Sequence, residues 1–313
     1  MIFRTEVAFP DFRSKIQKGD RVILLGSCFS SEMEPYFSKI GLKTLSNPFG
    51  VIFHPLIIAR ILGEAISELS EVELVKRGEL YFSWGSSGEI YSDSEDRLIR
   101  LVNEKRELLR DSLRDPNAKL FLTFGTSYGY KLVENHQMVA NCHKQPGTMF
   151  QKELSEISEM YAVFKQLWLD LKDFNPSIEV YTSVSPVRHI KDGIRNNNIS
   201  KSRLLELTSQ MESLGVEYIP AYELILDELR DYRFFEADLI HPNRIAKDFL
   251  WEKMSEVLLD KNDIEAFRKV ADYHTQFAHR TLYPESEEEK QRLVRLKEQR
   301  EELIRNYPEM QIK

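Results

Sequence analysis

Two short apolar segments that each end at a glycine constrain the fold of this chain most strongly. Residues 21–25 run into Gly26, and residues 119–124 run into Gly125. Together with a third segment, residues 178–184, they have the length and composition of buried strands. Longer stretches with helical spacing separate them, which predicts parallel pairing through right-handed crossovers. The expected fold is therefore α/β: a doubly wound, flavodoxin-like, mostly parallel sheet with helices on both faces.

The stretches between the expected strands place apolar residues at the spacing of amphipathic helices. Ligands of doubly wound folds bind outside the carboxyl ends of the parallel strands. We therefore expect the chemistry of this protein just after the strands, at residues 26–29, 125–128 and 183–188. We also expect one short strand at residues 216–219. The predicted helices cover residues 31–40, 54–69, 95–113, 151–171, 201–214 and 243–259.

The charge balance and the apolar content limit the partners that this chain can have. It carries 43 Lys and Arg residues against 50 Asp and Glu residues, which gives a formal net charge of −7. Because nucleic-acid binding requires a basic surface that neutralises phosphates, we expect no nucleic-acid partner. The longest apolar runs, residues 22–25 and 56–62, are far shorter than the ~20 residues of a membrane-spanning helix. We therefore expect no membrane partner.

The cysteine count and the first residues bear on the cellular location. The sequence has two cysteines, Cys28 and Cys142, which are too few for a disulfide framework. The first residues lack the basic and apolar regions of a secretory signal. We therefore expect a cytoplasmic protein in which both cysteines are free thiols.

Residues 26–29 combine the features of a reactive turn. Gly26 closes the first expected strand, and Ser27 and Cys28 follow it just before a predicted helix. A glycine permits a tight turn, and the first N–H groups of a helix stabilise a thiolate or an oxyanion. These features favour a nucleophile at this turn. The alternative is a structural cysteine beside a turn serine, since free cysteines are commonly buried.

A second motif lies in the loop before the last predicted helix of the α/β pattern. Asp238 and His241 are spaced so that a tight turn can bring the carboxylate to the imidazole. A carboxylate in that position holds the tautomer of the histidine and stabilises its charged form. The motif thus favours His241 as general base and Asp238 as its orienting partner. The alternative is a helix-capping segment, with Asn243 as the cap and Asp238 in solvent.

Two further loops carry polar side chains beyond expected strands. Asn141 can donate its side-chain amide to an oxyanion, and His143 with Lys144 can bind an anionic group. Arg188 lies beyond the third expected strand, where it can hold a carboxylate or phosphate in a bidentate manner. The alternatives are a hydrogen-bonded structural loop around Cys142 and a structural or surface arginine at position 188.

Several of these motifs together resemble the GSCFA-domain proteins of bacteria. Residues 26–30 read Gly-Ser-Cys-Phe-Ser, which matches the motif that names the family except that Ser30 replaces its alanine. The GSCFA domain in turn resembles the SGNH (GDSL-like) hydrolases, so the resemblance implies a fold of the SGNH hydrolase type. The resemblance covers roughly residues 20–260, with further similar segments in the same order at 47–50, 141–144, 183–189, 227–234 and 241–242.

The likeness to SGNH hydrolases implies a catalytic set. That group places its nucleophilic serine after the first strand, in a Gly-Asp-Ser motif, and an Asp-x-x-His motif near the end. Asp238 and His241 match the second motif. Aligned without a gap, Cys28 takes the position of the nucleophile, and Ser27 is the second choice. The resemblance therefore implies a thiol variant of the catalytic centre.

The same likeness implies where an oxyanion is held. The donors of SGNH hydrolases are the nucleophile's own N–H, a glycine after the second strand and an asparagine after the third. By their order in the chain, Gly50 or Asn47 corresponds to the second donor. Gly125 and Thr126 follow the next strand but lack the asparagine, and Asn141 is the candidate to replace it.

These residues predict a hydrolase or acyltransferase that acts on an ester or acyl group, with an acylated carbohydrate as one candidate substrate and no cofactor. The first alternative is a non-catalytic module of the same fold that binds a carbohydrate or a small acidic metabolite. A second is a zinc site made of Cys28, Cys142, His143 and His241, which lack the short paired spacing of zinc motifs. We expect no metal.

The end of the chain differs in character from the rest. Residues 285–305 are dense in Glu, Lys and Arg with sparse leucine and valine, which is typical of a solvated helix. We therefore divide the chain into a domain at residues 1–270 and a charged helical extension at residues 271–313.

Overall fold

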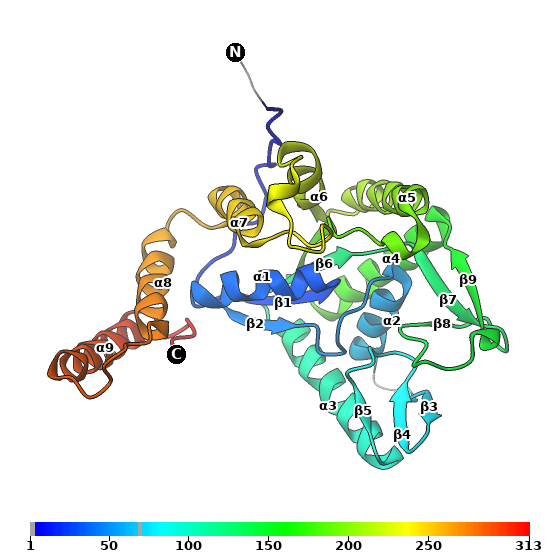
Figure 1. Cartoon of the computed structure of the whole chain (residues 1–313), viewed down its shortest axis with the longest axis horizontal. Coiled ribbons are helices and arrows are strands. Elements are labelled where there is room, and N and C mark those ends of the chain that lie inside the picture. Colours follow the sequence, from blue (N-terminus) through cyan, green and yellow to red (C-terminus); the bar gives the residue numbers. More distant parts are fainter. Residues whose placement is uncertain (1–3, 68–70) are drawn as a thin grey trace.

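A parallel sheet forms the centre of the molecule (Figure 1). The computed structural model describes residues 4–67 and 71–313, and within these residues the sheet has the strand order β2-β1-β6-β10-β11. Every neighbouring pair is parallel. In chain order this is the flavodoxin-like pattern, so the predicted fold class is confirmed. The strands are β1 (Arg21–Gly26), β2 (Lys43–Ser46), β6 (Ala118–Phe124), β10 (Glu179–Val184) and β11 (Glu217–Tyr218).

Helices cover both faces of this sheet, because side chains alternate between the faces along each strand. Ile23 and Leu25 of β1 enter a core with helices α2 to α5, whereas Val22 and Leu24 enter a core with α1, α7 and α8. None of the helices in the described residues has the length and apolar character to cross a membrane. The helices are α1 (Cys28–Lys39), α2 (Pro55–Ile66), α3 (Glu95–Arg114), α4 (Ile157–Phe174), α5 (Ile194–Glu212), α6 (Ala221–Glu223), α7 (Arg244–Leu258), α8 (Ile264–Ala278) and α9 (Glu287–Asn306).

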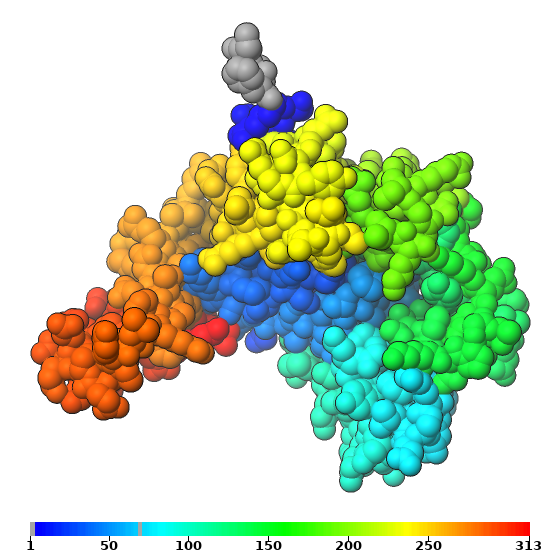
Figure 2. All heavy atoms as spheres, in the orientation of Figure 1, coloured from blue at the N-terminus to red at the C-terminus, as the bar shows by residue number. Residues whose placement is uncertain are grey.

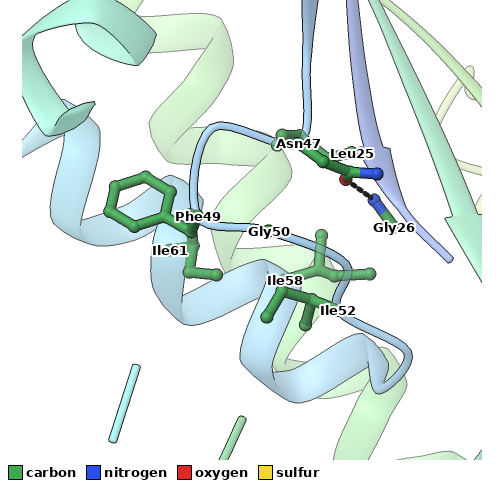
Figure 3. A pocket seen from close by; sticks show the side chains of 8 residues that line it. All are labelled: Leu25, Gly26, Asn47, Phe49, Gly50, Ile52, Ile58 and Ile61. Atoms are coloured by element: carbon green, nitrogen blue, oxygen red, sulfur yellow. Dashed lines mark hydrogen bonds between the residues drawn. The ribbon is translucent and has the colours of Figure 1, made fainter. Parts of the chain in front are cut away.

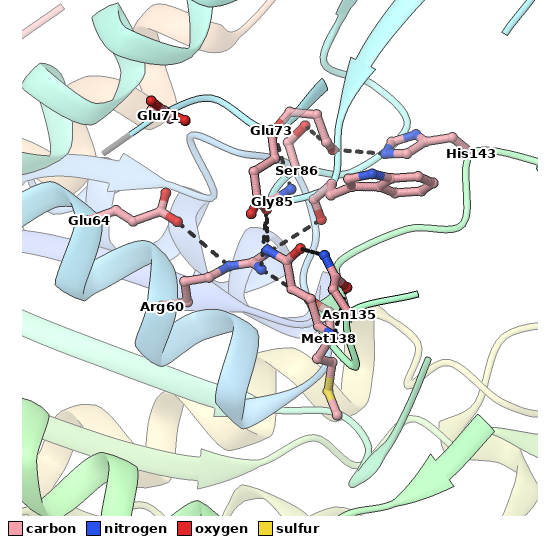
Figure 4. Close-up of polar contacts among 12 residues, drawn as sticks. Arg60, Glu64, Glu71, Glu73, Gly85, Ser86, Asn135, Met138 and His143 are labelled. Carbon is pink, nitrogen blue, oxygen red and sulfur yellow. Dashed lines mark hydrogen bonds and ion pairs between the residues drawn. The ribbon is translucent and has the colours of Figure 1, made fainter. Parts of the chain in front are cut away.

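Two small antiparallel sheets are inserted into the α/β pattern, one after α2 and one after β6. Figure 1 shows both at the same end of the molecule. Trp84 packs with Leu132 and Val139 between them, and Arg60 of α2 donates to the carbonyl oxygens of Trp84 and Met138 (Figure 4). The first comprises β3 (Leu74–Arg77), β4 (Leu80–Ser83) and β5 (Tyr91–Ser92), and the second β7 (Tyr128–Leu132), β8 (Met138–Val139) and β9 (Phe150–Leu154).

Several predicted element boundaries are wrong. The helix expected over 151–171 begins only at Ile157, because residues 150–154 pair with β7 as strand β9. Helix α1 begins at Cys28 rather than at residue 31, and α5 begins at Ile194 rather than at residue 201. Helix α2 ends at Ile66, and Leu69, the expected end of that helix, lies outside the described residues.

The C-terminal segment forms a lobe beside the main body, coloured orange to red in Figure 2. Leu296 and Leu303 of α9 are buried in the same core as the helix α1 side chain Phe37. The backbone N–H of Gln311 donates to the carbonyl oxygen of Gly41 at 2.7 Å. The expected division between residues 270 and 271 falls inside α8, and the two-part organisation of the chain stays a prediction.

Candidate active site

A cavity of about 630 Å³ lies where the central strands end. Cys28 follows β1, Thr126 follows β6 and Arg188 follows β10, and all three line the cavity. The segment before α2 and the β7–β8 hairpin contribute further walls, and His241 lines it as well. In the flavodoxin-like order the switch point, where such sheets bind ligands, lies between β1 and β6. The cavity thus occupies the expected place and has the size of a small-molecule site.

The turn between β1 and α1 allows no side chain at its first position. Gly26 has a φ of +139°, and a Cβ there would lie 2.1 Å from the carbonyl oxygen of Thr123. The N–H of Ser27 donates to that same oxygen at 3.0 Å. Ser27 is 1% exposed, does not line the cavity, and its hydroxyl has no partner among the described residues. The alternative that Ser27 is the nucleophile is therefore corrected, because substrate cannot reach it.

Cys28 is the first residue of α1 and is partly exposed to the cavity. Burial raises the pKa of its thiol above the ordinary value, and the nearby carboxylate of Glu32 raises it further. The backbone N–H groups of Phe29 and Cys28 and the charge of Lys201 act in the opposite direction but do not outweigh burial. The resting group is therefore a thiol, and a base must remove its proton before it can attack.

His241 and Asp238 form a closely coupled pair. One carboxylate oxygen of Asp238 accepts the backbone N–H groups of Ile240 and His241 at 2.9 and 3.0 Å. The other lies 2.6 Å from Nδ1 of His241, and these bonds, led by the backbone N–H of His241, lower the pKa of Asp238 to about 2. The ionised carboxylate accepts the Nδ1 proton, which leaves Nε2 as the proton acceptor.

Asn47 and Gly50 do not reach this cavity, and their expected role as oxyanion donors is corrected. Asn47 accepts the N–H of Gly26 at 2.8 Å and donates to Ser31 at 2.8 Å. Gly50 donates its N–H to the carbonyl oxygen of Asn47, and a Cβ at Gly50 would lie 1.8 Å from the hydroxyl of Ser87. Figure 3 shows both beside a void of about 10 Å³. They hold the strand ends in place.

The backbone N–H groups of Gly125 and Thr126 also make hydrogen bonds within the protein. Both donate to the carbonyl oxygen of Phe53, at 2.8 and 3.2 Å. Of the two, only Thr126 lines the cavity, and its hydroxyl is bonded to Ser200 and accepts the N–H of Tyr128. Neither backbone N–H is free to hold an oxyanion, which corrects that part of the expected site.

Asn141 lines the cavity, and its side-chain oxygen accepts the N–H of His143 at 2.7 Å. Its side-chain NH₂ has no acceptor among the described residues, so it can donate to a ligand. His143 instead faces away: it is 3% exposed, stacks on Phe82 and places Nε2 2.9 Å from the carbonyl oxygen of Ser83 (Figure 4). The expected anion-binding role of His143 is therefore corrected to a structural one.

The position of His143 argues against the zinc site, because this proposed ligand lies away from the other three. Cys28, Cys142 and His241 line the cavity, whereas the fourth proposed ligand does not. Across residues 4–67 and 71–313, three or more side chains of the metal-binding types do not gather into a group that could hold an ion.

Two residues at or near the cavity were not singled out from the sequence. His189 lines the cavity, and burial lowers the pKa of its imidazole to about 4. Lys201 of α5 does not line the cavity but acts electrostatically on Cys28; it is 2% exposed, and its Nζ donates to the carbonyl oxygens of Gly125 and Ser185, both at 2.6 Å. His189 directly follows residues 183–188, where the sequence already predicted chemistry beyond the third strand. Nothing in the local sequence indicates that Lys201 is buried, because lysines in helices are mostly exposed.

Comparison with known proteins adds one match. The family model described as the GSCFA family matches residues 21–254, which include Cys28, Asp238 and His241. No curated protein matches the sequence.

Proposed function

The chain belongs to the GSCFA family, and from the geometry of its cavity we propose that it is a hydrolase or acyltransferase acting on an ester or acyl group. One observation carries the proposal. His241 is held by Asp238 at 2.6 Å, and it lines the same cavity as Cys28 at the carboxyl end of β1. A base oriented by a carboxylate and a reachable nucleophile on the wall of one cavity are the groups that acyl transfer requires.

In the proposed reaction, Nε2 of His241 takes the proton of Cys28 as Sγ attacks the carbonyl carbon. The carbon–sulfur bond forms, the ester carbon–oxygen bond breaks, and the leaving alkoxide takes the proton from Nε2. Water or an acceptor hydroxyl then gives its proton to Nε2 of His241 as its oxygen attacks the thioester carbon. The new carbon–oxygen bond forms, the carbon–sulfur bond breaks, and the Cys28 thiolate takes the proton back from Nε2. Asp238 stabilises the charged imidazole in each step.

Two donors support the oxyanion in this proposal. The N–H of Cys28 is among the first four of helix α1, which have no partner inside the helix, and the helix dipole adds favourable potential there. Asn141 supplies the second donor through its free side-chain amide. Both were among the expected donors, whereas the groups expected at Asn47, Gly50 and Gly125 are bonded elsewhere in the protein.

The alternative function is a non-catalytic module that binds a carbohydrate or a small acidic metabolite in the same cavity. The raised pKa of Cys28 favours this alternative, because burial and Glu32 both disfavour the thiolate. An acylated carbohydrate as substrate and a cytoplasmic location both stay predictions from the sequence.

Acylation of Cys28 by a small activated ester such as p-nitrophenyl acetate tests the proposal. We expect mass spectrometry to find the acetyl group on Cys28, and we expect His241→Ala to slow its formation by about 10²-fold or more, as for other general bases. His279→Ala, at an exposed histidine outside the cavity, is the matched control and should react like the unaltered protein. No acetyl group on Cys28, or equal rates in both histidine variants, would leave the binding module as the better account.

A further inference from the structure

The cavity carries an excess of positive charge although the chain as a whole has a net charge of −7. Three basic side chains line it, namely Lys152, Arg188 and Lys191, and Asp192 is the one carboxylate among the described lining residues. Asp192 is already paired with Lys152. The charges of Arg188 and Lys191 are therefore not compensated at the cavity wall.

Arg188 lies in the wall between two cavities. It lines both the main cavity and a neighbouring cavity of about 510 Å³. The side chain is half-buried, yet it has no hydrogen-bond or ion-pair partner among the described residues. A partly buried guanidinium without a partner is unfavourable, so this side chain is poised to bind an anion.

The two carboxylates that line the neighbouring cavity have other hydrogen-bond partners. Asp231 and Asp238 line the neighbouring cavity with Arg188. Asp231 accepts the N–H of Arg233 at 2.9 Å, and Asp238 is held by His241 and by two backbone N–H groups. Neither carboxylate makes an ion pair with Arg188, which leaves the guanidinium available to a ligand.

Lys201 is a further basic group that interacts electrostatically with Arg188 and Cys28. Its partners are the carbonyl oxygens of Gly125 and Ser185, and it makes no ion pair with a carboxylate in the part of the chain that the structure describes. Burial, with a smaller contribution from the repulsion by Arg188, lowers the pKa of Lys201 to about 7, against the opposing effect of Cys28. An anion bound here would favour the charged form of Lys201.

We propose that the ligand of this site carries an anionic group, a carboxylate or a phosphate, and that Arg188 holds that group at the junction of the two cavities. The planar guanidinium can make two parallel hydrogen bonds to either group. The acyl part of the ligand rests on the proposed function and would lie at Cys28, whereas the anionic part would be recognised with or without catalysis.

Alkylation of Cys28 by two reagents of similar size tests this inference. Iodoacetate carries a carboxylate and iodoacetamide does not, and the same thiolate displaces iodide from each. The measured quantity is the ratio of the iodoacetate rate to the iodoacetamide rate at Cys28, divided by the same ratio for glutathione. At pH 8, where a free imidazole is neutral, we expect a ratio about tenfold above that of glutathione, as one charge-assisted contact would provide.

Arg188→Met should return the ratio to that of glutathione, and Arg188→Lys should keep part of the preference. Arg195→Met is the matched control, because Arg195 is exposed on α5 and lines neither cavity. The inference is overturned if the unaltered protein shows the glutathione ratio or if Arg188→Met leaves the ratio unchanged. Failure of the proposed function is seen separately, as an absence of acetyl-Cys28, because the ratio compares two reagents on one thiol.

Protection of Cys28 from iodoacetamide then distinguishes the two anionic groups. Succinate is the carboxylate probe, and inorganic phosphate is the phosphate probe. The probe that slows labelling at the lower concentration in the unaltered protein, but not in Arg188→Met, identifies the group. Arg195→Met keeps Arg188 and should be protected like the unaltered protein. If neither probe protects Cys28 in these two proteins, or if Arg188→Met is protected equally well, Arg188 does not hold a free anion and the inference fails.

Discussion

At the scale of single residues, the turn at Gly26 decides where the thiol of Cys28 lies. The φ of +139° suits glycine, and the carbonyl oxygen of Thr123 occupies the space that a Cβ would need. The preceding strand and the following helix are both anchored in the cores, so the turn cannot move aside cheaply. The position of the Cys28 thiol therefore depends on the absence of a side chain at residue 26.

Gly26→Ala should destabilise the protein by about 3 kcal/mol or more, because it combines an unfavourable φ with a clash against backbone. Gly78→Ala is the matched control: Gly78 also has a positive φ, of +59°, but nothing lies within 4 Å of its Cβ position. We expect about 1 kcal/mol there. Urea denaturation of both variants measures the difference, and equal losses would mean that the clash is relieved by movement of the turn.

At the scale of elements, the cap of helix α7 holds the loop that carries His241. Asn243 accepts the N–H of Ala246 at 3.2 Å and donates to the carbonyl oxygen of Arg233 at 2.7 Å. One side chain thus closes the helix and ties down the segment before His241. The cap at Asn243, which was the alternative interpretation of this segment, coexists with the Asp238–His241 contact.

Asn243→Ala should cost about 1 kcal/mol of stability through loss of the cap, and it should also slow acylation of Cys28 because the loop of His241 loses its anchor. Ser94→Ala removes the N-cap residue of α3, whose side chain makes no capping hydrogen bond, and should have little effect on either quantity. Stability from urea denaturation and the acylation rate check both variants. A stable Asn243→Ala protein with an unchanged rate would show that the loop is held by other contacts.

At the scale of the whole molecule, several histidines are packed in the neutral form. Burial lowers the pKa of His54 and of His189 to about 4, and it also lowers the pKa values of His143 and His274. In the unfolded chain these groups take up protons near pH 6.5. Because the unfolded state then binds more protons, stability falls as the pH drops from about 6.5 towards 4.

For His54 alone, this linkage predicts a loss of about 2 kcal/mol between pH 7 and pH 5. His54→Asn should remove that part of the pH dependence, because asparagine can still accept the N–H of Leu56 that Nδ1 of His54 caps. The free energy of unfolding at both pH values measures it, with the exposed His136→Asn as control. An unchanged difference between the two pH values would mean that His54 is not held neutral in the folded state.

Local patterns along the chain were enough to predict the architecture and to place Cys28 and His241, which line one cavity. The strand–glycine–helix pattern at Gly26 and the Asp-x-x-His spacing at Asp238 depend on neighbours within a few residues. The same reasoning failed at residues 150–154, whose pairing partner is β7. Strand pairing of so short a segment is set by contacts that local periodicity does not carry.

By itself, the sequence determined that the chain would form a flavodoxin-like sheet with Cys28 at the carboxyl end of its first strand, because helix spacing, apolar runs and turn glycines act locally. Only the tertiary structure decided which polar groups are available. In the tertiary structure the backbone N–H of Gly125 donates to Phe53, His143 lies against Ser83, and Lys201 is buried with its Nζ bonded to Gly125. The physical reason is that burial and hydrogen-bond partners depend on segments distant in the chain, which no local pattern specifies.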